Sequence, residues 1–147
     1  MTNLAPIRHS ADTEAPVHTY GDVRTGPKTI LRLEGAVVLA LASALYEQTG
    51  SGWTLFAAMF LIPDLSMLGY LVNRRVGASV YNLGHNCILP CLLGLYGVMA
   101  SQPLFLSLAL IWVAHVGFDR MVGYGLKYDT GFQHTHLGHG RPTSVSA

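Results

Sequence analysis

The chain has 147 residues, of which 50% are apolar and 12% are charged, about half the charged share expected of a soluble domain. Its formal net charge is +1, and it contains neither a sustained basic face nor a nucleic-acid motif, so we expect no nucleic-acid partner. The two cysteines, Cys87 and Cys91, lie four residues apart in an apolar run, which excludes a CxxC pair and a disulfide framework.

The first 28 residues contain prolines and glycines but no periodic apolar pattern, which predicts a flexible arm over residues 1–28. They also lack the apolar core of a signal peptide, so we expect insertion to depend on later segments. Four apolar stretches follow, each close to the roughly 20 residues that cross a bilayer core. They cover about residues 30–46, 53–72, 76–99 and 103–124. The sequence therefore predicts an all-α bundle of four transmembrane helices (residues 29–128), followed by a tail (residues 129–147).

Basic residues near the ends of these stretches predict the orientation of the bundle. They precede the first stretch, form the second turn and close the fourth stretch: Arg24, Lys28, Arg32, Arg74, Arg75, Arg120 and Lys127. The first and third turns contain no Lys or Arg. Because basic residues accumulate on the cytoplasmic side of a membrane, we expect both termini in the cytoplasm.

Ionisable and amide side chains lie inside the predicted spans, where an isolated charge costs roughly 3 kcal/mol and therefore needs a partner or a watery cavity. They are Glu34, Asp64, Asn82, His85, Asn86, His115, Asp119 and Arg120. His115 and Asp119 are four residues apart, so they share one face of the fourth helix.

The depth of these residues predicts that several of them meet. A rise of about 1.5 Å per residue from the cytoplasmic ends places Asp64, His85 and His115 roughly 12 to 13 Å deep on three different helices. By the same rise, a second set lies at roughly 7 to 9 Å: Glu34, Asn82 and Asp119.

A proline and three glycines predict local features near this level. Pro63 has no N–H, which frees the carbonyl of Met59 and predicts a bend beside Asp64. Small residues also permit close helix approach, and the sequence places three of them in this region: Gly69, Gly84 and Gly117.

Two imidazoles and two or three carboxylates in a dry bundle form a ligand set for a divalent metal, because bundles build such sites from inward-facing residues. Mixed nitrogen and oxygen ligands suit Zn²⁺, Mn²⁺ or Fe²⁺. With one coordination position open, the metal would lower the pKa of a bound water and make a hydrolytic nucleophile. Two alternatives stay open: a hydrogen-bonded network that only fixes helix packing, and a proton relay. The apolar outer halves of the helices argue against the relay.

The enzyme interpretation is a metal-dependent hydrolase acting on a lipid-like, membrane-soluble substrate. Asp64, His85, His115 and Asp119 are the expected ligands, and Glu34 and Asp119 are the candidate catalytic residues. The competing interpretation is a non-catalytic membrane subunit or scaffold.

The tail carries three histidines: His134, His136 and His139. A His-rich tract can bind metal, and this one emerges on the same side as the predicted site. As a closing lid it would supply His136 as a further ligand. The alternative is a tail with incidental histidines.

Five sequence blocks occur in order along the chain: LRLEG (31–35), PDLSMLGY (63–70), VGASVYNLGH (76–85), HVGFDRMVGYGLKY (115–128) and THLG (135–138). Together they resemble a bacterial integral-membrane family, catalogued as domain of unknown function 4260. The resemblance implies a multi-pass protein of the bacterial inner (cytoplasmic) membrane and implies no activity. A weaker likeness is to membrane-bound metal-dependent hydrolases, whose additional histidine motifs this sequence lacks.

Overall fold

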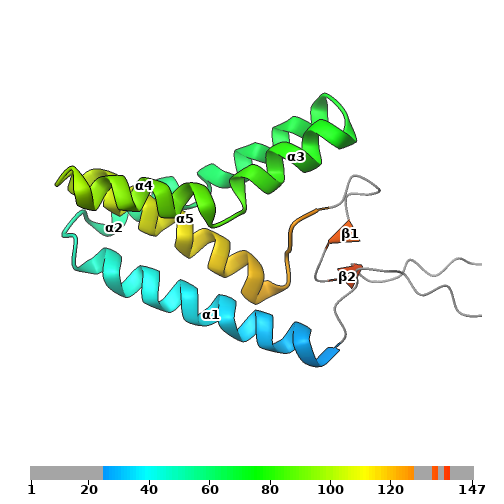
Figure 1. The fold of residues 1–147 in the computed structure, drawn as a ribbon, viewed down its shortest axis with the longest axis horizontal. Helices are drawn as coiled ribbons and strands as arrows, with labels where there is room; N and C mark the ends of the chain where they lie inside the picture. Colours follow the sequence, from blue (N-terminus) through cyan, green and yellow to red (C-terminus); the bar gives the residue numbers. More distant parts are fainter. Residues whose placement is uncertain (1–24, 128–133, 136–137, 140–147) are drawn as a thin grey trace, which may run out of the picture.

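The computed structural model describes residues 25–127, 134–135 and 138–139, and within them the chain is almost entirely helical (Figure 1). The elements in chain order are α1 (Thr25–Glu47), α2 (Trp53–Phe60), the 3₁₀ helix η1 (Ile62–Leu71), α3 (Arg74–Gly84), α4 (Ile88–Met99), α5 (Pro103–Val122), β1 (His134–Thr135) and β2 (Gly138–His139). The two-residue strands pair antiparallel. The predicted all-α fold is confirmed.

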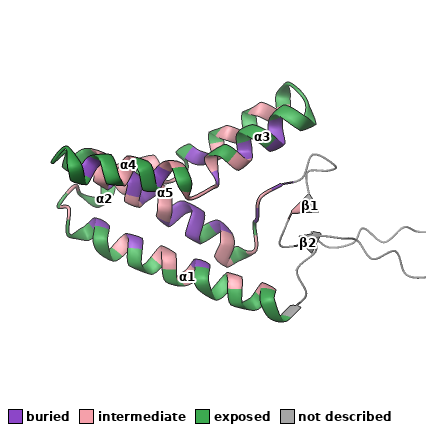
Figure 2. Cartoon of the chain, in the orientation of Figure 1, coloured by how far each residue is buried: buried purple, intermediate pink, exposed green. Residues whose placement is uncertain are grey.

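Helix α5 is the centre of the bundle. Helices α1 and α4 pack on opposite sides of it, and α3 pairs with η1. Figure 2 shows that buried residues concentrate on α5, whereas large apolar side chains on the outer faces are exposed. Within the described part of the chain, three segments are long and apolar enough to cross a membrane: Gly26–Glu47, Trp53–Leu71 and Pro103–Val122. Exposed apolar faces on such segments are typical of a membrane protein.

The second segment changes from an α-helix to a 3₁₀ helix at the predicted bend. Pro63 stands in the first turn of η1, and the N–H of Asp64 donates to the carbonyl of Leu61 three residues back (3.2 Å). A 3₁₀ stretch inside a longer helix often marks a functional position. The proline therefore sets the local geometry at Asp64.

The prediction of one continuous helix over residues 76–99 is wrong. Helix α3 ends at Gly84 and α4 begins at Ile88. The reason is Pro90, because its ring in a continuous helix would clash with the carbonyl of Asn86 four residues earlier. Two helices of 11 and 12 residues replace the single long one.

The side chain of Asn86 bridges this break. Its Nδ2 donates to the carbonyls of Asn82 (2.9 Å) and Leu83 (2.7 Å), and its Oδ1 accepts from the N–H of Ile88 (2.8 Å). One amide therefore satisfies backbone groups at the end of α3 and at the start of α4, which the interrupted helix leaves without helical partners.

The two ends of the bundle differ in charge. At one end, Arg32 of α1 donates to the final carbonyls of α5, from Nε to Met121 (3.0 Å) and from Nη2 to Val122 (2.8 Å). Figure 1 shows the start of α3 at this same end, on the right. The opposite end holds the turns 48–52 and 100–102, which contain no Lys or Arg.

Helices α1 and α5 approach closely at two glycines. A Cβ added to Gly117 would lie 2.7 Å from the nitrogen of Leu39 and 2.9 Å from the carbonyl oxygen of Gly35. A Cβ on Gly35 would lie 2.6 Å from the nitrogen of Met121. The close approach predicted at Gly117 is confirmed, and it fixes where the two helices cross.

Substitution of Gly117 by alanine tests this packing. We expect Gly117→Ala to lower the free energy of unfolding by about 1–3 kcal/mol, because the added methyl overpacks a backbone contact. Gly26→Ala is the matched control, since a Cβ there meets nothing within 4 Å. Unfolding in mixed detergent and SDS measures both, and equal effects would contradict the crossing described above.

Candidate metal centre

Four side chains from three parts of the chain converge in the bundle. They are Asp64 of η1, His85 directly after α3, and His115 and Asp119 of α5. One ligand atom from each lies within 4.8 Å of all the others. Three of the residues are buried, whereas the side chain of Asp64 is 40% exposed. The structure thus brings together four of the residues that the sequence singles out, and it leaves the cluster open at Asp64.

Both helix breaks lie beside this cluster. Asp64 follows the proline that starts η1, and His85 follows the last residue of α3. Interrupted helices in membrane proteins commonly hold their ligands at the interruption, where the backbone departs from regular helix. The breaks therefore position the two residues that α5 does not supply.

Of the six separations between the ligand atoms, the one between the two carboxylate oxygens is within 4.8 Å, and the other five are shorter. They are 3.2 Å for His115 Nε2–His85 Nε2, 3.3 Å for His85 Nε2–Asp64 Oδ1, 3.4 Å for His85 Nε2–Asp119 Oδ2, 3.6 Å for His115 Nε2–Asp64 Oδ1 and 3.9 Å for His115 Nε2–Asp119 Oδ2. Four ligands at metal–ligand bonds of about 2.1 Å in a tetrahedron are about 3.4 Å apart. The cluster therefore has the size of a tetrahedral metal site.

A contact with the backbone determines the tautomer of His85, that is, which ring nitrogen carries the proton and which carries a lone pair. Its Nδ1 lies 2.9 Å from the carbonyl of Tyr81, which can only accept, so Nδ1 carries the proton. In the neutral imidazole Nε2 then carries a lone pair, and it faces the oxygens of Asp64 and Asp119. Three electron-rich atoms this close are stable only with a cation or an additional proton among them.

Tyr81 supports the cluster, although the sequence did not mark it. Its hydroxyl donates to Oδ2 of Asp119 (3.3 Å), and its ring stacks on His85 with centroids 3.8 Å apart. An aromatic residue near a membrane interface is usually read as part of an aromatic belt. The signal that could have found Tyr81 is its spacing of four residues from His85, which places both on one helical face.

Lys127 is a second residue whose position sequence reasoning missed. Asn82 holds its backbone, with Nδ2 donating to the Lys127 carbonyl (2.8 Å) and Oδ1 accepting from its N–H (2.7 Å). The Lys127 ammonium lies 4.2 Å from the centroid of the Tyr81 ring. Burial lowers the pKa of Lys127 below its usual range, and the carboxylates of Asp119 and Asp64 act in the opposite direction.

The structure does not place every predicted site residue in the cluster. Glu34 is exposed on α1 and, together with Arg120, lines a separate cavity formed by α1 and α5. The structure thus does not bring Glu34, a predicted catalytic residue, into the cluster, and its catalytic role stays a prediction. His136 lies outside the described residues.

The family model described as Domain of unknown function (DUF4260) matches residues 28–139. The chain belongs to this family. The DUF4260 match includes all four residues of the cluster together with Tyr81, Asn82 and Lys127. No curated protein and no solved structure matches the chain significantly. The resemblance to this family is thus confirmed, and the weaker likeness to membrane-bound hydrolases has no support from these comparisons.

Trypsin tests the contact between Asn82 and Lys127. We expect Asn82→Ala to accelerate cleavage after Lys127 about tenfold or more, because two hydrogen bonds of roughly 1 kcal/mol each no longer oppose local opening. Mass spectrometry follows the cleavage in detergent. Ser79→Ala, at an exposed position of α3, is the control. An unchanged rate in Asn82→Ala would show that Asn82 does not hold this segment.

Proposed function

We propose that this protein is a multi-pass membrane protein that binds one divalent metal ion through Asp64, His85, His115 and Asp119. The observation that carries the proposal is the close approach of the four ligand atoms, since five of their six separations lie between 3.2 and 3.9 Å, near the edge length of a tetrahedral site. A divalent ion would also neutralise two carboxylates that otherwise repel each other inside a membrane.

Zn²⁺ is the ion that fits this site best. Zinc is almost always tetrahedral with four protein ligands and accepts both imidazole nitrogen and carboxylate oxygen. Mn²⁺ and Fe²⁺ accept the same ligand types and are the competitors. The contact of His85 Nδ1 with the Tyr81 carbonyl is the kind of outer-sphere hydrogen bond that orients a metal-binding imidazole.

We further propose how the protein lies in the bilayer. Segments Gly26–Glu47, Trp53–Leu71 and Pro103–Val122 each cross it, and α3 and α4 together make a broken fourth crossing. The basic end of the bundle faces the cytoplasm under the positive-inside rule. The family resemblance favours a bacterial inner membrane.

Catalysis is the finer part of the proposal. The metal would activate a water at the exposed edge beside Asp64 for hydrolysis of a lipid-like substrate. Catalytic zinc sites keep one position open beside three protein ligands, so with four protein ligands the water would have to take a fifth position. Asp119, held by Tyr81, would accept the proton. The support for catalysis is the 40% exposure of Asp64 in an otherwise buried cluster.

A metal-free network is the second candidate, and one observation favours it. Nδ1 of His115 is buried without a hydrogen-bond partner among the described residues. A metal on Nε2 would require the proton on Nδ1, whereas a proton on Nε2 can be donated to Nε2 of His85 at 3.2 Å. In this case the four residues only fix the packing of η1, α3 and α5.

Elemental analysis of detergent-purified protein separates the two candidates. We expect one metal ion per chain. Loss of an outer-sphere contact typically weakens metal affinity roughly 10- to 100-fold. We expect a loss in this range for Tyr81→Phe, and a larger loss for His85→Ala and for His115→Ala. A protein with alanine at all three tail histidines is the control and should keep its metal: His134, His136 and His139.

The network candidate predicts a different result for the same proteins. Metal content would be nil in the wild type, and the two His→Ala changes would only lower thermal stability. That combination would overturn the metal proposal.

Hydrolysis of a long-chain p-nitrophenyl ester and of p-nitrophenyl phosphate tests the catalytic part. We expect metal-dependent turnover that falls about 10²- to 10⁴-fold in Asp119→Asn, the range for loss of a general base, measured with Asp119→Asn fully loaded with metal because Asp119 is also a proposed ligand. Glu34→Gln should retain activity, because Glu34 lies on α1 outside the cluster. Loss of turnover in Glu34→Gln alone would contradict this assignment.

A further inference from the structure

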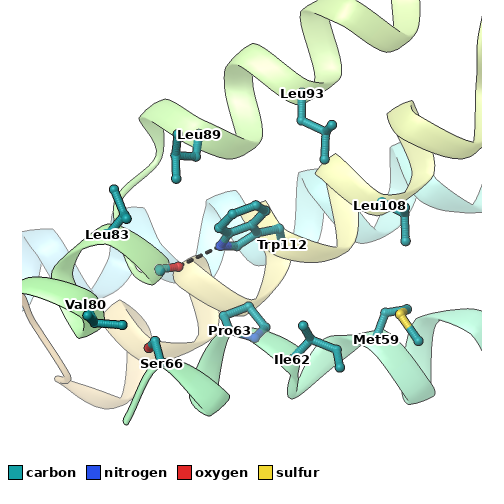
Figure 3. Close-up of a pocket in the computed structure, with 11 residues that line it drawn as sticks. Met59, Ile62, Pro63, Ser66, Val80, Leu83, Leu89, Leu93, Leu108 and Trp112 are labelled. Atoms are coloured by element: carbon teal, nitrogen blue, oxygen red, sulfur yellow. Dashed lines mark hydrogen bonds between the residues drawn. The ribbon is translucent and has the colours of Figure 1, made fainter. Parts of the chain in front are cut away.

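An apolar cavity of about 460 Å³ lies next to the candidate metal centre. Its lining residues come from α2, η1, α3, α4 and α5, and Figure 3 shows their side chains around Trp112. Small-molecule sites typically have volumes of about 300–1,000 Å³ and mostly apolar walls. The cavity therefore has the size and character of a ligand site.

The polar groups at its wall are few and already engaged. The indole N–H of Trp112 donates to the carbonyl of Gly84 (2.6 Å), as the dashed line in Figure 3 shows. The hydroxyl of Ser66 lies 3.4 Å from Nδ1 of His85. No charged side chain of the described residues lines the cavity. An occupant would therefore contribute hydrocarbon and would not need to form hydrogen bonds there.

The cavity and the metal cluster share a wall. Pro63 and Gly84 line the cavity, and the next residue after each of them, Asp64 and His85, belongs to the cluster. The same two helix breaks thus shape both features. A molecule in the cavity lies one residue away from two of the proposed metal ligands.

We propose that the cavity holds the hydrocarbon chain of a membrane amphiphile, with its polar group directed to the exposed side of Asp64. This placement of the polar group rests on the proposed metal site. The binding site for the hydrocarbon chain, called the chain site below, rests on the cavity alone. The lining segments include two that are apolar enough to cross a membrane, Trp53–Leu71 and Pro103–Val122, so lipid hydrocarbon surrounds them.

The lining favours a hydrocarbon chain over a protein segment as the occupant. The wall is almost wholly apolar and its few polar groups are engaged, whereas a protein segment brings backbone N–H and C=O groups that need partners. A thin acyl or isoprenoid chain brings none.

Fluorescence of Trp112 gives a direct test, because this residue lines the cavity. The chain has two tryptophans, so Trp53→Phe leaves Trp112 as the only one. The probe is a phosphatidylcholine brominated in the middle of one acyl chain, titrated into detergent-purified protein. We expect saturable quenching of Trp112. Trp112→Phe, which leaves the exposed Trp53, should show only gradual, non-saturating quenching.

A matched pair of leucines on α4 localises the effect. Leu93 lines the cavity, whereas Leu92 is exposed outside it. In the Trp53→Phe background, Leu93→Phe should raise the lipid concentration at half-saturation about tenfold, because the larger ring overfills the site. Leu92→Phe should leave it unchanged, and thermal unfolding in detergent like that of the Trp53→Phe parent should confirm that both variants fold.

Three results would overturn the chain site: quenching of Trp112 that never saturates, quenching equal to that of Trp53, or equal shifts in the two leucine variants. The outcome is separable from that of the metal proposal. Saturable quenching in a protein without metal upholds the chain site and overturns only the direction of the polar group. Metal binding without saturable quenching overturns the chain site and leaves the proposed function standing.

Discussion

A helix that breaks among apolar side chains must satisfy its own backbone groups, because apolar surroundings supply no hydrogen-bond partners. In this protein the amide of Asn86 meets that requirement between α3 and α4. The indole of Trp112 adds a donor for the carbonyl of Gly84. Because these contacts hold the break in one geometry, His85 stays directed at α5. The candidate site depends on this satisfied interruption.

The consequence is an unusual concentration of electron-rich atoms in an apolar bundle. Nε2 of His85 lies 3.3 Å from Asp64 and 3.4 Å from Asp119, while its own proton is engaged by the Tyr81 carbonyl. A cation satisfies all of these atoms at once, whereas a proton satisfies one pair. The exposed edge at Asp64 and the apolar cavity beside it would give the proposed cation access to a membrane-soluble molecule.

Much of this architecture follows from the sequence, and the remainder depends on contacts between distant segments. Hydropathy predicts the helices, and the depth of each residue along its helix predicts that Asp64, His85 and His115 lie at the same level. Depth does not tell which way a side chain faces. Gly35 packs against α5, so Glu34, about 100° round the helix, is turned away from the cluster. Pro90 carried the signal for the break in the third stretch, but the capping by Asn86 arises only in three dimensions.

X-ray absorption at the metal edge of the purified, zinc-loaded protein tests whether these four side chains hold the ion. We expect two imidazole nitrogens and two carboxylate oxygens at about 2.0–2.2 Å, with no sulfur, and a weaker imidazole contribution in His85→Ala. A spectrum of hydrated zinc, or one unchanged by His85→Ala, would rule out the proposed metal site.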